Sequence, residues 1–258
     1  MFNSIRAQRS WPPSVRRASR TMLLAAAVST SLLLVPVAAQ AAKSSAKPPP
    51  RQETVTLLSV KWVTAKPVYG SRTLVAVADQ RPITLTRTTL PVLAEQTDAE
   101  GRTWLKVRLP GRVFNRKTPP KTGWITASNT RRSATTWHVV VNVRMRLVTV
   151  YRNGRRSRTF VAVVGKAATP TPRGEYFIEE TMRLSRNFPG APYALAASAR
   201  SPVLKQFMGG PGQIALHGIG NIGGPMGTAA SHGCIRVSNS AVTWLARHIR
   251  AGTPLTIR

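Results

Sequence analysis

The chain has 258 residues, of which 38 are Lys or Arg and 8 are Asp or Glu, giving a formal charge of +30. Hydrophobic residues make up 42%, which is enough for folded domains and excludes a wholly disordered basic chain. The single cysteine excludes a disulfide within the chain and a Cys-rich tetrahedral zinc site. No P-loop motif for binding nucleotide phosphates occurs.

The first forty or so residues have the layout of a secretory signal. Arginines within residues 6–20 precede an apolar run at 22–39, and Ala-Gln-Ala at 39–41 supplies small residues at the positions that a signal peptidase reads. We therefore expect a signal peptide at 1–41, cleavage after Ala41 with no stable membrane span left, and a secreted, cell-wall-associated protein. The alternative is an uncleaved membrane anchor, although the run is short and interrupted for a spanning helix.

The positive charge is spread along the chain rather than confined to one tail. A secreted protein with this charge meets polyanions, so anionic cell-wall polymers are candidate partners. The alternative is a solubilising surface charge. No nucleic-acid-binding motif occurs, and we expect no specific nucleic-acid partner.

A linker and a small β-rich segment come next. Residues 42–53 are rich in Lys, Ser, Ala and Pro and are predicted to be an extended linker. Residues 54–130 contain short β-patterned runs between turn signals, which favours a small β-barrel. Trp104 and Trp124 in this segment either bind a ligand or pack in its core.

The last segment, 136–258, is predicted to be β-rich with one amphipathic helix. Alternating valines begin near Trp137, and Asn153-Gly154 favours a type I′ hairpin turn. Ser238 or Asn239 can cap a helix whose apolar residues recur at helical spacing. The fold class is therefore mostly β, with two domains.

The residues that suit acyl transfer lie between Ile214 and Arg236. A short predicted strand ends in His217, a glycine-rich loop follows, and the next motif is Ser-His-Gly-Cys-Ile-Arg, at 231–236. An imidazole can take the proton of a neighbouring thiol and leave a thiolate nucleophile. The glycines let backbone N–H groups turn toward a developing oxyanion.

This frame of His-Gly, a loop of about a dozen residues and Ser-His-Gly-Cys-Ile-Arg resembles the signature of YkuD-type L,D-transpeptidase catalytic domains. Pro170-Thr-Pro-Arg-Gly174 and the closing Gly252-Thr-Pro also resemble that family. The resemblance covers about 136–258. Residues 84–128 resemble bacterial Src-homology-3-type modules, which often precede wall-modifying enzymes.

The transpeptidase resemblance implies a β-rich fold, a cysteine acyl-enzyme and 3→3 cross-linking of peptidoglycan stem peptides. By motif position, Cys234 is the expected nucleophile and His217 the expected base. His232 is expected to support the loop or position these groups. Backbone N–H groups of Gly233 and Cys234 are expected to form the oxyanion hole.

Three further residues are expected to contact substrate: Arg236, Gly218 and Tyr193. Arg236 has the planar fork that suits a carboxylate, although a solvated surface charge is the alternative. No acidic residue follows Glu180, so the acceptor that orients His217 is expected to be a backbone carbonyl. Many family members carry an acidic residue soon after the position of Asn239, and this chain has none.

Two other functions stay open beside the transpeptidase: an L,D-carboxypeptidase that uses water at the same site, and a non-catalytic cell-wall-binding protein. A metal site made by His217, His232 and Cys234 is disfavoured because only three ligands lie close in sequence. We therefore expect no metal and no cofactor.

Overall fold

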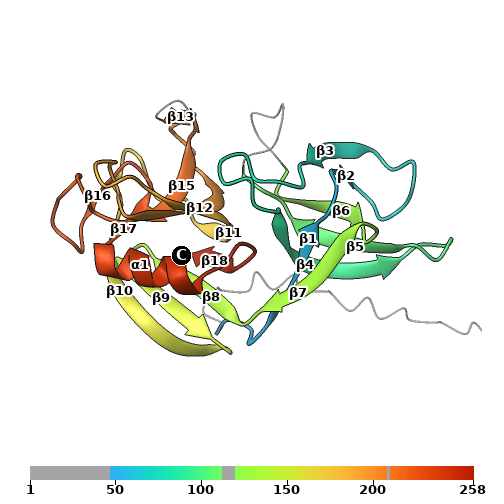
Figure 1. Cartoon of the computed structure of the whole chain (residues 1–258), viewed down its shortest axis with the longest axis horizontal. Helices are drawn as coiled ribbons and strands as arrows, with labels where there is room; N and C mark the ends of the chain where they lie inside the picture. Colours follow the sequence, from blue (N-terminus) through green and yellow to red (C-terminus); the bar gives the residue numbers. More distant parts are fainter. Residues whose placement is uncertain (1–46, 112–119, 208–209) are drawn as a thin grey trace, which may run out of the picture. The chain divides into compact units, whose positions relative to one another are not determined.

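The computed structural model describes residues 47–111, 120–207 and 210–258 (Figure 1). The predicted signal segment 1–41 and the first part of the predicted linker lie outside the described residues. Within the described residues, no helix is long and apolar enough to cross a membrane.

Seven strands form an antiparallel sheet in the order β3-β2-β6-β5-β4-β1-β7. They are β1 (Gln52–Leu57), β2 (Lys61–Thr64), β3 (Thr73–Val77), β4 (Thr89–Thr97), β5 (Thr103–Arg108), β6 (Thr122–Thr126) and β7 (Thr130–Thr135). Leu105 and Val107 of β5 are fully buried, as the predicted alternation requires. Trp104 is also buried, and its indole N–H donates to Asp98. The likeness of this region to Src-homology-3-type modules stays a prediction.

Nine strands form the second sheet, in the order β16-β10-β17-β15-β12-β11-β18-β8-β9. They are β8 (Trp137–Asn142), β9 (Leu147–Arg152), β10 (Arg155–Gly165), β11 (Gly174–Arg183), β12 (Tyr193–Arg200), β15 (Gln213–His217), β16 (Ala229–Ser231), β17 (Ile235–Val237) and β18 (Pro254–Ile257). The first part of β10 pairs with β9 and its last part with β17, so the strand order closes on itself. A separate pair consists of β13 (Gln206–Phe207) and β14 (Gly210–Pro211).

The predicted hairpin and helix are both present in this second region. Asn153 and Gly154 have φ values of 51° and 69°, as a type I′ turn requires, and they join β9 to β10. The helix α1 (Asn239–His248) begins after Ser238, whose hydroxyl accepts from the N–H of Ala241. The structure thus selects Ser238, not Asn239, as the cap.

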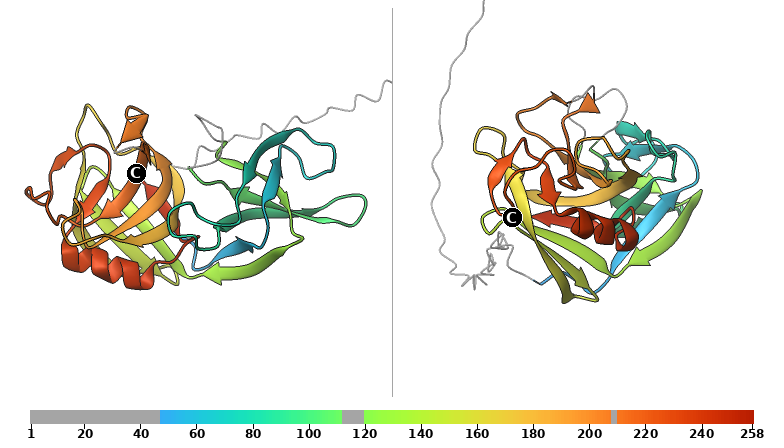
Figure 2. Two further views of the ribbon diagram at one scale, coloured as in Figure 1. Left: turned by 45° about the horizontal axis from the view of Figure 1, so that its top comes forward. Right: turned by 60° about the vertical axis from the view of Figure 1, so that its left-hand side comes forward.

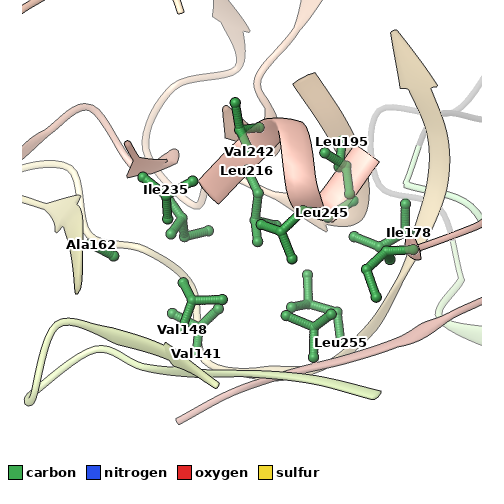
Figure 3. Packing of buried hydrophobic residues seen from close by; sticks show 14 of the residues in the cluster. Val141, Val148, Ala162, Ile178, Leu195, Leu216, Ile235, Val242, Leu245 and Leu255 are labelled. Atoms are coloured by element: carbon green, nitrogen blue, oxygen red, sulfur yellow. The ribbon is translucent and has the colours of Figure 1, made fainter. Parts of the chain in front are cut away.

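The apolar face of α1 completes the core of the second sheet. Val242 and Leu245 are fully buried and point into the same cluster as Val148 and Leu255 (Figure 3). Figure 2 shows α1 in red alongside the strands of this sheet from two further sides. Fully burying a Leu or Val side chain stabilises a fold by roughly 1.5–3 kcal/mol, so these residues account for the position of the helix.

The strand β11 takes part in two hydrophobic cores. Ile178 lies in the core of the second sheet, whereas its neighbour Phe177 packs with the core of the first sheet. Glu179 on the same strand is buried and forms an ion pair with Arg81 and a hydrogen bond with the N–H of Gly111. Through these contacts, β11 packs against the first sheet and its loops while it pairs with β12 in the second sheet.

Candidate active site

The candidate base ends the strand β15, and the candidate nucleophile immediately precedes β17, the neighbouring parallel strand. In the pairing of β15 with β17, Leu216 is opposite Ile235 and His217 is opposite Arg236. Leu216 and Ile235 are fully buried in the core. Because side chains alternate along a strand, His217, Arg236 and Cys234 project from the other face of the sheet. The alternation alone therefore brings three of the predicted site residues to one surface.

These side chains line a small cavity of about 100 Å³, which we call the Cys234 cleft. Its walls include residues from both strands and from the loops beside them: Gln213, His217, Ser231, His232, Cys234 and Arg236. His232 is exposed at its rim, whereas Cys234 and Arg236 are half-buried. The residues lining the cleft do not include Gly218 or Tyr193, and Tyr193 packs against the core of the second sheet.

The ring of His217 is oriented by a backbone carbonyl. Its Nδ1 lies 2.8 Å from the carbonyl oxygen of Gly218, so Nδ1–H is the donor and Nε2 carries the free lone pair. Gly190 packs against the same ring with a φ of 90°, and a Cβ there would come within 2.6 Å of Nδ1. These contacts fix the orientation of the ring and select the neutral tautomer in which Nε2 can accept a proton.

The loop after His217 is held by an amide side chain from the start of α1. The Oδ1 of Asn239 accepts from the N–H groups of Ile219 (3.0 Å) and Gly220 (3.1 Å). The N–H of Gly218 donates to the carbonyl of Gly190 at 2.9 Å. The sequence showed Asn239 only as a candidate helix cap, because nothing in the local pattern indicates a contact with a loop twenty residues earlier.

The loop before Cys234 is held by buried hydroxyl groups. Thr171 Oγ1 donates to the carbonyl of Gly233 and accepts from the N–H of Gly165, both at 2.8 Å. Ser231 Oγ donates to the carbonyl of Cys234 at 2.6 Å and is itself fully buried. The Thr-Pro-Thr-Pro segment at 169–172 therefore supports the loop before Cys234.

One of the two predicted oxyanion donors is engaged within the protein. The N–H of Gly233 donates to Ser231 Oγ at 3.1 Å, so it points at a side chain rather than into open space. Gly233 has a φ of 118°, which allows this inward turn of the backbone. For Gly233 to bind an oxyanion, this hydrogen bond to Ser231 would have to break.

Both reacting groups are biased toward their neutral forms. Burial lowers the pKa of the His217 imidazole, with the charge of Arg236 acting in the same direction and the Gly218 carbonyl opposing it. Burial raises the pKa of the Cys234 thiol, while a backbone hydrogen bond at Ala215 and the Arg236 charge act to lower it. The thiol contacts the carbonyl of Gln213, 4.0 Å away, rather than the imidazole. The resting site is therefore a neutral thiol beside a neutral imidazole.

Gln213 is a cleft residue that the sequence did not single out. Its Nε2 donates to the carbonyl of Ala197 at 2.9 Å, and its side chain also donates to the carboxylate of Glu179. Since both partners are acceptors, the amide nitrogen is turned toward them. These two hydrogen bonds fix the orientation of the Gln213 amide at the wall of the cleft.

Arg236 brings a positive charge to the same wall of the cleft. Its Nε is buried and has no hydrogen-bond partner among the described residues. A buried donor without a partner is costly, and a ligand carboxylate would satisfy it. Among the same residues, no group of three His, Cys, Asp or Glu side chains could hold a metal ion.

Residues 136–257 match the family model of the YkuD L,D-transpeptidase catalytic domain. The YkuD protein of Bacillus subtilis strain 168, whose name assigns it to the L,D-transpeptidases, is 35% identical over 121 residues. A YkuD protein of Bacillus licheniformis is 32% identical over 121 residues. Each match covers 47% of this chain, and the chain spans 65% of the length of each relative.

Solved structures with similarity to the chain include Bdellovibrio bacteriovorus Bd1075, at 26% identity and a TM-score of 0.38, with 48% of each chain covered. The catalytic domain of the Enterococcus faecium L,D-transpeptidase has 18% identity and a TM-score of 0.37, covering 47% of this chain and 95% of that domain. The cleft residues on β15 and β17 all fall inside the segment that the family model matches. Residues 136–257 are therefore similar to L,D-transpeptidase catalytic domains of the YkuD type.

Proposed function

We propose that this protein is an exported L,D-transpeptidase that cross-links peptidoglycan stem peptides 3→3 through a thioester on Cys234. The observation that carries the proposal is that His217, at the end of β15, and Cys234, immediately before the neighbouring strand β17, line one cleft. A thiol and an imidazole whose Nε2 is free to accept a proton are the groups that nucleophilic acyl transfer requires.

In the first half-reaction, the Cys234 sulfur attacks the carbonyl carbon of the donor peptide while Nε2 of His217 takes the thiol proton. The tetrahedral intermediate collapses, its bond to the terminal D-residue breaks, and His217 returns the proton to the leaving amine. In the second half-reaction, an acceptor amine attacks the thioester and loses a proton to His217, which protonates the departing thiolate. Because both groups rest in neutral form, proton transfer accompanies the attack rather than preceding it.

Arg236 suits the carboxylate of the terminal D-residue in this scheme. Arg236 lies on the strand that follows Cys234 and lines the cleft, where its guanidinium charge suits a planar anion. Donor stems that end in a free carboxylate would be selected by this contact, whereas amidated stems would lose it.

The same thioester can also react with water, which would make the protein an L,D-carboxypeptidase. The two reactions share every step up to the acyl-enzyme and differ in how well the cleft excludes water and holds an amine. Mass spectrometry of the products formed from a disaccharide-tetrapeptide separates them. A dimer lacking one terminal D-residue supports cross-linking, and loss of that residue without a dimer supports hydrolysis.

Matched variants assign the reaction to this cleft. Cys234→Ala and His217→Ala should both abolish product, and a carbapenem should add one adduct mass to the wild type but not to Cys234→Ala. A wild-type protein that forms neither product nor adduct would instead support the third function, a non-catalytic cell-wall-binding protein.

We also propose that the first sheet positions the enzyme on the cell wall. Trp62 on β2 is 68% exposed and is the large aromatic residue best placed to contact a wall ligand. Since Phe177 packs with the core of the first sheet, deleting that sheet would expose a buried side chain, so a point substitution is the sharper test. Trp62→Ala should weaken retention on insoluble wall material and spare turnover of small peptides. Unchanged retention would make the sheet a folding partner only.

A further inference from the structure

Arginines and aromatic rings gather where β8, β9, β10 and the end of α1 come together. We call this surface the arginine–tryptophan face and define it by Trp137, Arg152, Arg155, Arg158, Trp244 and His248. In the strand register, Trp137 is opposite Arg152, and Arg152 is opposite Arg155. Directly opposite residues project from the same side of a sheet, so three adjacent strands contribute one row of side chains. Figure 1 shows α1 alongside these strands.

The rings of this face are stacked on one another and two of them carry guanidinium groups. His248 stacks on Trp244 at a centroid distance of 4.1 Å, and Trp137 meets Trp244 edge-on at 5.8 Å. The guanidinium carbon of Arg152 lies 5.1 Å from the centre of the Trp137 ring, and that of Arg158 lies 5.0 Å from Trp244. A guanidinium on a ring loses freedom of movement but keeps its N–H groups at its edges, so it is ordered before it binds an anion.

No acidic group compensates the charge of this face. Arg152, Arg155 and Arg158 form no ion pair within the described part of the chain. In the first sheet, by contrast, Arg132 forms an ion pair with Glu95. Two arginines directly opposite each other on paired strands are unfavourable, and this chain places Arg152 opposite Arg155.

The acidic residues of 136–258 lie elsewhere, on β11. Glu179 and Glu180 are buried there, and Glu175 accepts a hydrogen bond from Thr256. The face therefore has an unscreened positive potential that a multivalent anion from outside the chain would neutralise.

We propose that the arginine–tryptophan face binds a phosphodiester-linked cell-wall polymer. Guanidinium groups pair with phosphate through two parallel hydrogen bonds, and a repeating phosphate can engage several of them at once. This surface shares no residue with the Cys234 cleft, so the proposal goes beyond the proposed function and does not depend on activity.

The observations favour this polymer over a lipid surface or a nucleic acid. None of the exposed large hydrophobic side chains of the described residues belongs to the face, so nothing there would insert into a membrane. The Trp137 and Trp244 rings are already covered by guanidinium and imidazole groups, which leaves little ring surface for stacking bases.

The test measures binding of the full chain to poly(glycerol phosphate) by titration. A triple variant, Arg152→Gln, Arg155→Gln and Arg158→Gln, is compared with a control that removes the same charge elsewhere: Arg72→Gln, Arg131→Gln and Arg183→Gln. All six arginines are exposed and outside the Cys234 cleft. The face variant should bind at least about tenfold more weakly and the control within about threefold, since each lost phosphate contact removes its own counterion release. Equal weakening of both variants would overturn the proposal, because the binding would then follow net charge alone.

A single variant and two further ligands complete the experiment. The variant separates loss of binding from loss of folding, and the ligands identify the class of anion that is bound. Arg155 lies on no ring, so Arg155→Gln should leave the ring stack and the thermal unfolding midpoint unchanged while still weakening binding. The titration is repeated with phosphatidylglycerol vesicles and with duplex DNA. A loss for the face variant that is specific to poly(glycerol phosphate) supports the proposal, and an equal or larger loss with vesicles or DNA overturns the choice of ligand.

Discussion

His217 ends β15 and Cys234 immediately precedes the neighbouring strand β17, but the loops beside them are held in different ways. The loop after His217 pairs with the backbone of Gly190 and Ala191, and its side-chain support comes from exposed amides: Asn239 accepts from two N–H groups, and Asn221 donates to the carbonyl of Arg186. The loop before Cys234 is held by buried hydroxyls from Thr171 and Ser231, which bond to several backbone groups. The side chains that support the loop after His217 are therefore exposed to solvent, whereas those that support the loop before Cys234 are buried. Changes near the base should affect the reaction rate, and changes near the nucleophile should affect folding.

Gly190→Ala should give the largest effect on rate. The new Cβ would lie 2.6 Å from Nδ1 of His217, so the ring must move, and a misplacement of about 1 Å costs roughly 100-fold in rate. The measurement is kcat/KM with the tetrapeptide donor. Gly70→Ala is the control, because Gly70 also has a positive φ (75°) but nothing lies within 4 Å of its Cβ position. Equal loss of activity in both variants would mean that backbone strain, not ring displacement, is responsible.

Asn239→Ala should reduce kcat by roughly tenfold with a smaller change in KM, since the loop after His217 loses both side-chain hydrogen bonds. Ser240→Ala, at the next exposed position of α1, is the control and should stay near wild type. If Asn239→Ala lowered the thermal midpoint strongly and left kcat unchanged, the amide would be a support of the helix start rather than of the base.

Arg236→Gln tests the effect of the Arg236 charge on the pKa of the Cys234 thiol. The positive charge of Arg236 lowers the pKa of the Cys234 thiol and favours the thiolate, so its removal should move the pH profile of thiol alkylation upward. With iodoacetamide, a neutral reagent that needs no carboxylate contact, the rate at neutral pH should fall about two- to fivefold, as a contact worth up to ~1 kcal/mol implies. A downward shift of the profile would contradict this sign.

Thr171→Val should change turnover per folded molecule least and stability most. The substitution keeps the shape of the side chain but leaves the Gly165 N–H and the Gly233 carbonyl without their buried partner, at a cost of about 2 kcal/mol in the free energy of unfolding. Denaturant titration measures it, with Thr159→Val on the exposed part of β10 as the control. A large loss of kcat with an unchanged free energy of unfolding would contradict the proposed difference between the two loops.

Patterns in the sequence predicted those parts of the fold that depend on residues close to one another along the chain. Asn153-Gly154 predicted the hairpin because positive φ is required there, and the spacing of Val242 and Leu245 predicted the buried face of α1. The parallel pairing of β18 with β8 could not be predicted, since strand order depends on contacts between distant segments.

In the candidate site, too, the motif predicted some features, whereas others depend on tertiary packing. The His-Gly and Ser-His-Gly-Cys frame indicated which side chains share the cleft, and the absence of a nearby acidic residue indicated a backbone acceptor for His217. The frame could not show that Gly233 donates to Ser231, because that depends on the direction in which one peptide group turns. Nor could it show Gln213 or Asn239 beside the motif, since tertiary packing alone brings them there.

The buried, protonated thiol has a consequence for the lifetime of the protein. Peroxide oxidises the thiolate far faster than the thiol, and the chain has no second cysteine with which an oxidised Cys234 could form a disulfide. Burial that raises the pKa of Cys234 therefore slows the first oxidation step as well as setting the resting protonation state. The same burial therefore lowers the intrinsic reactivity of the Cys234 thiol and protects it from oxidation.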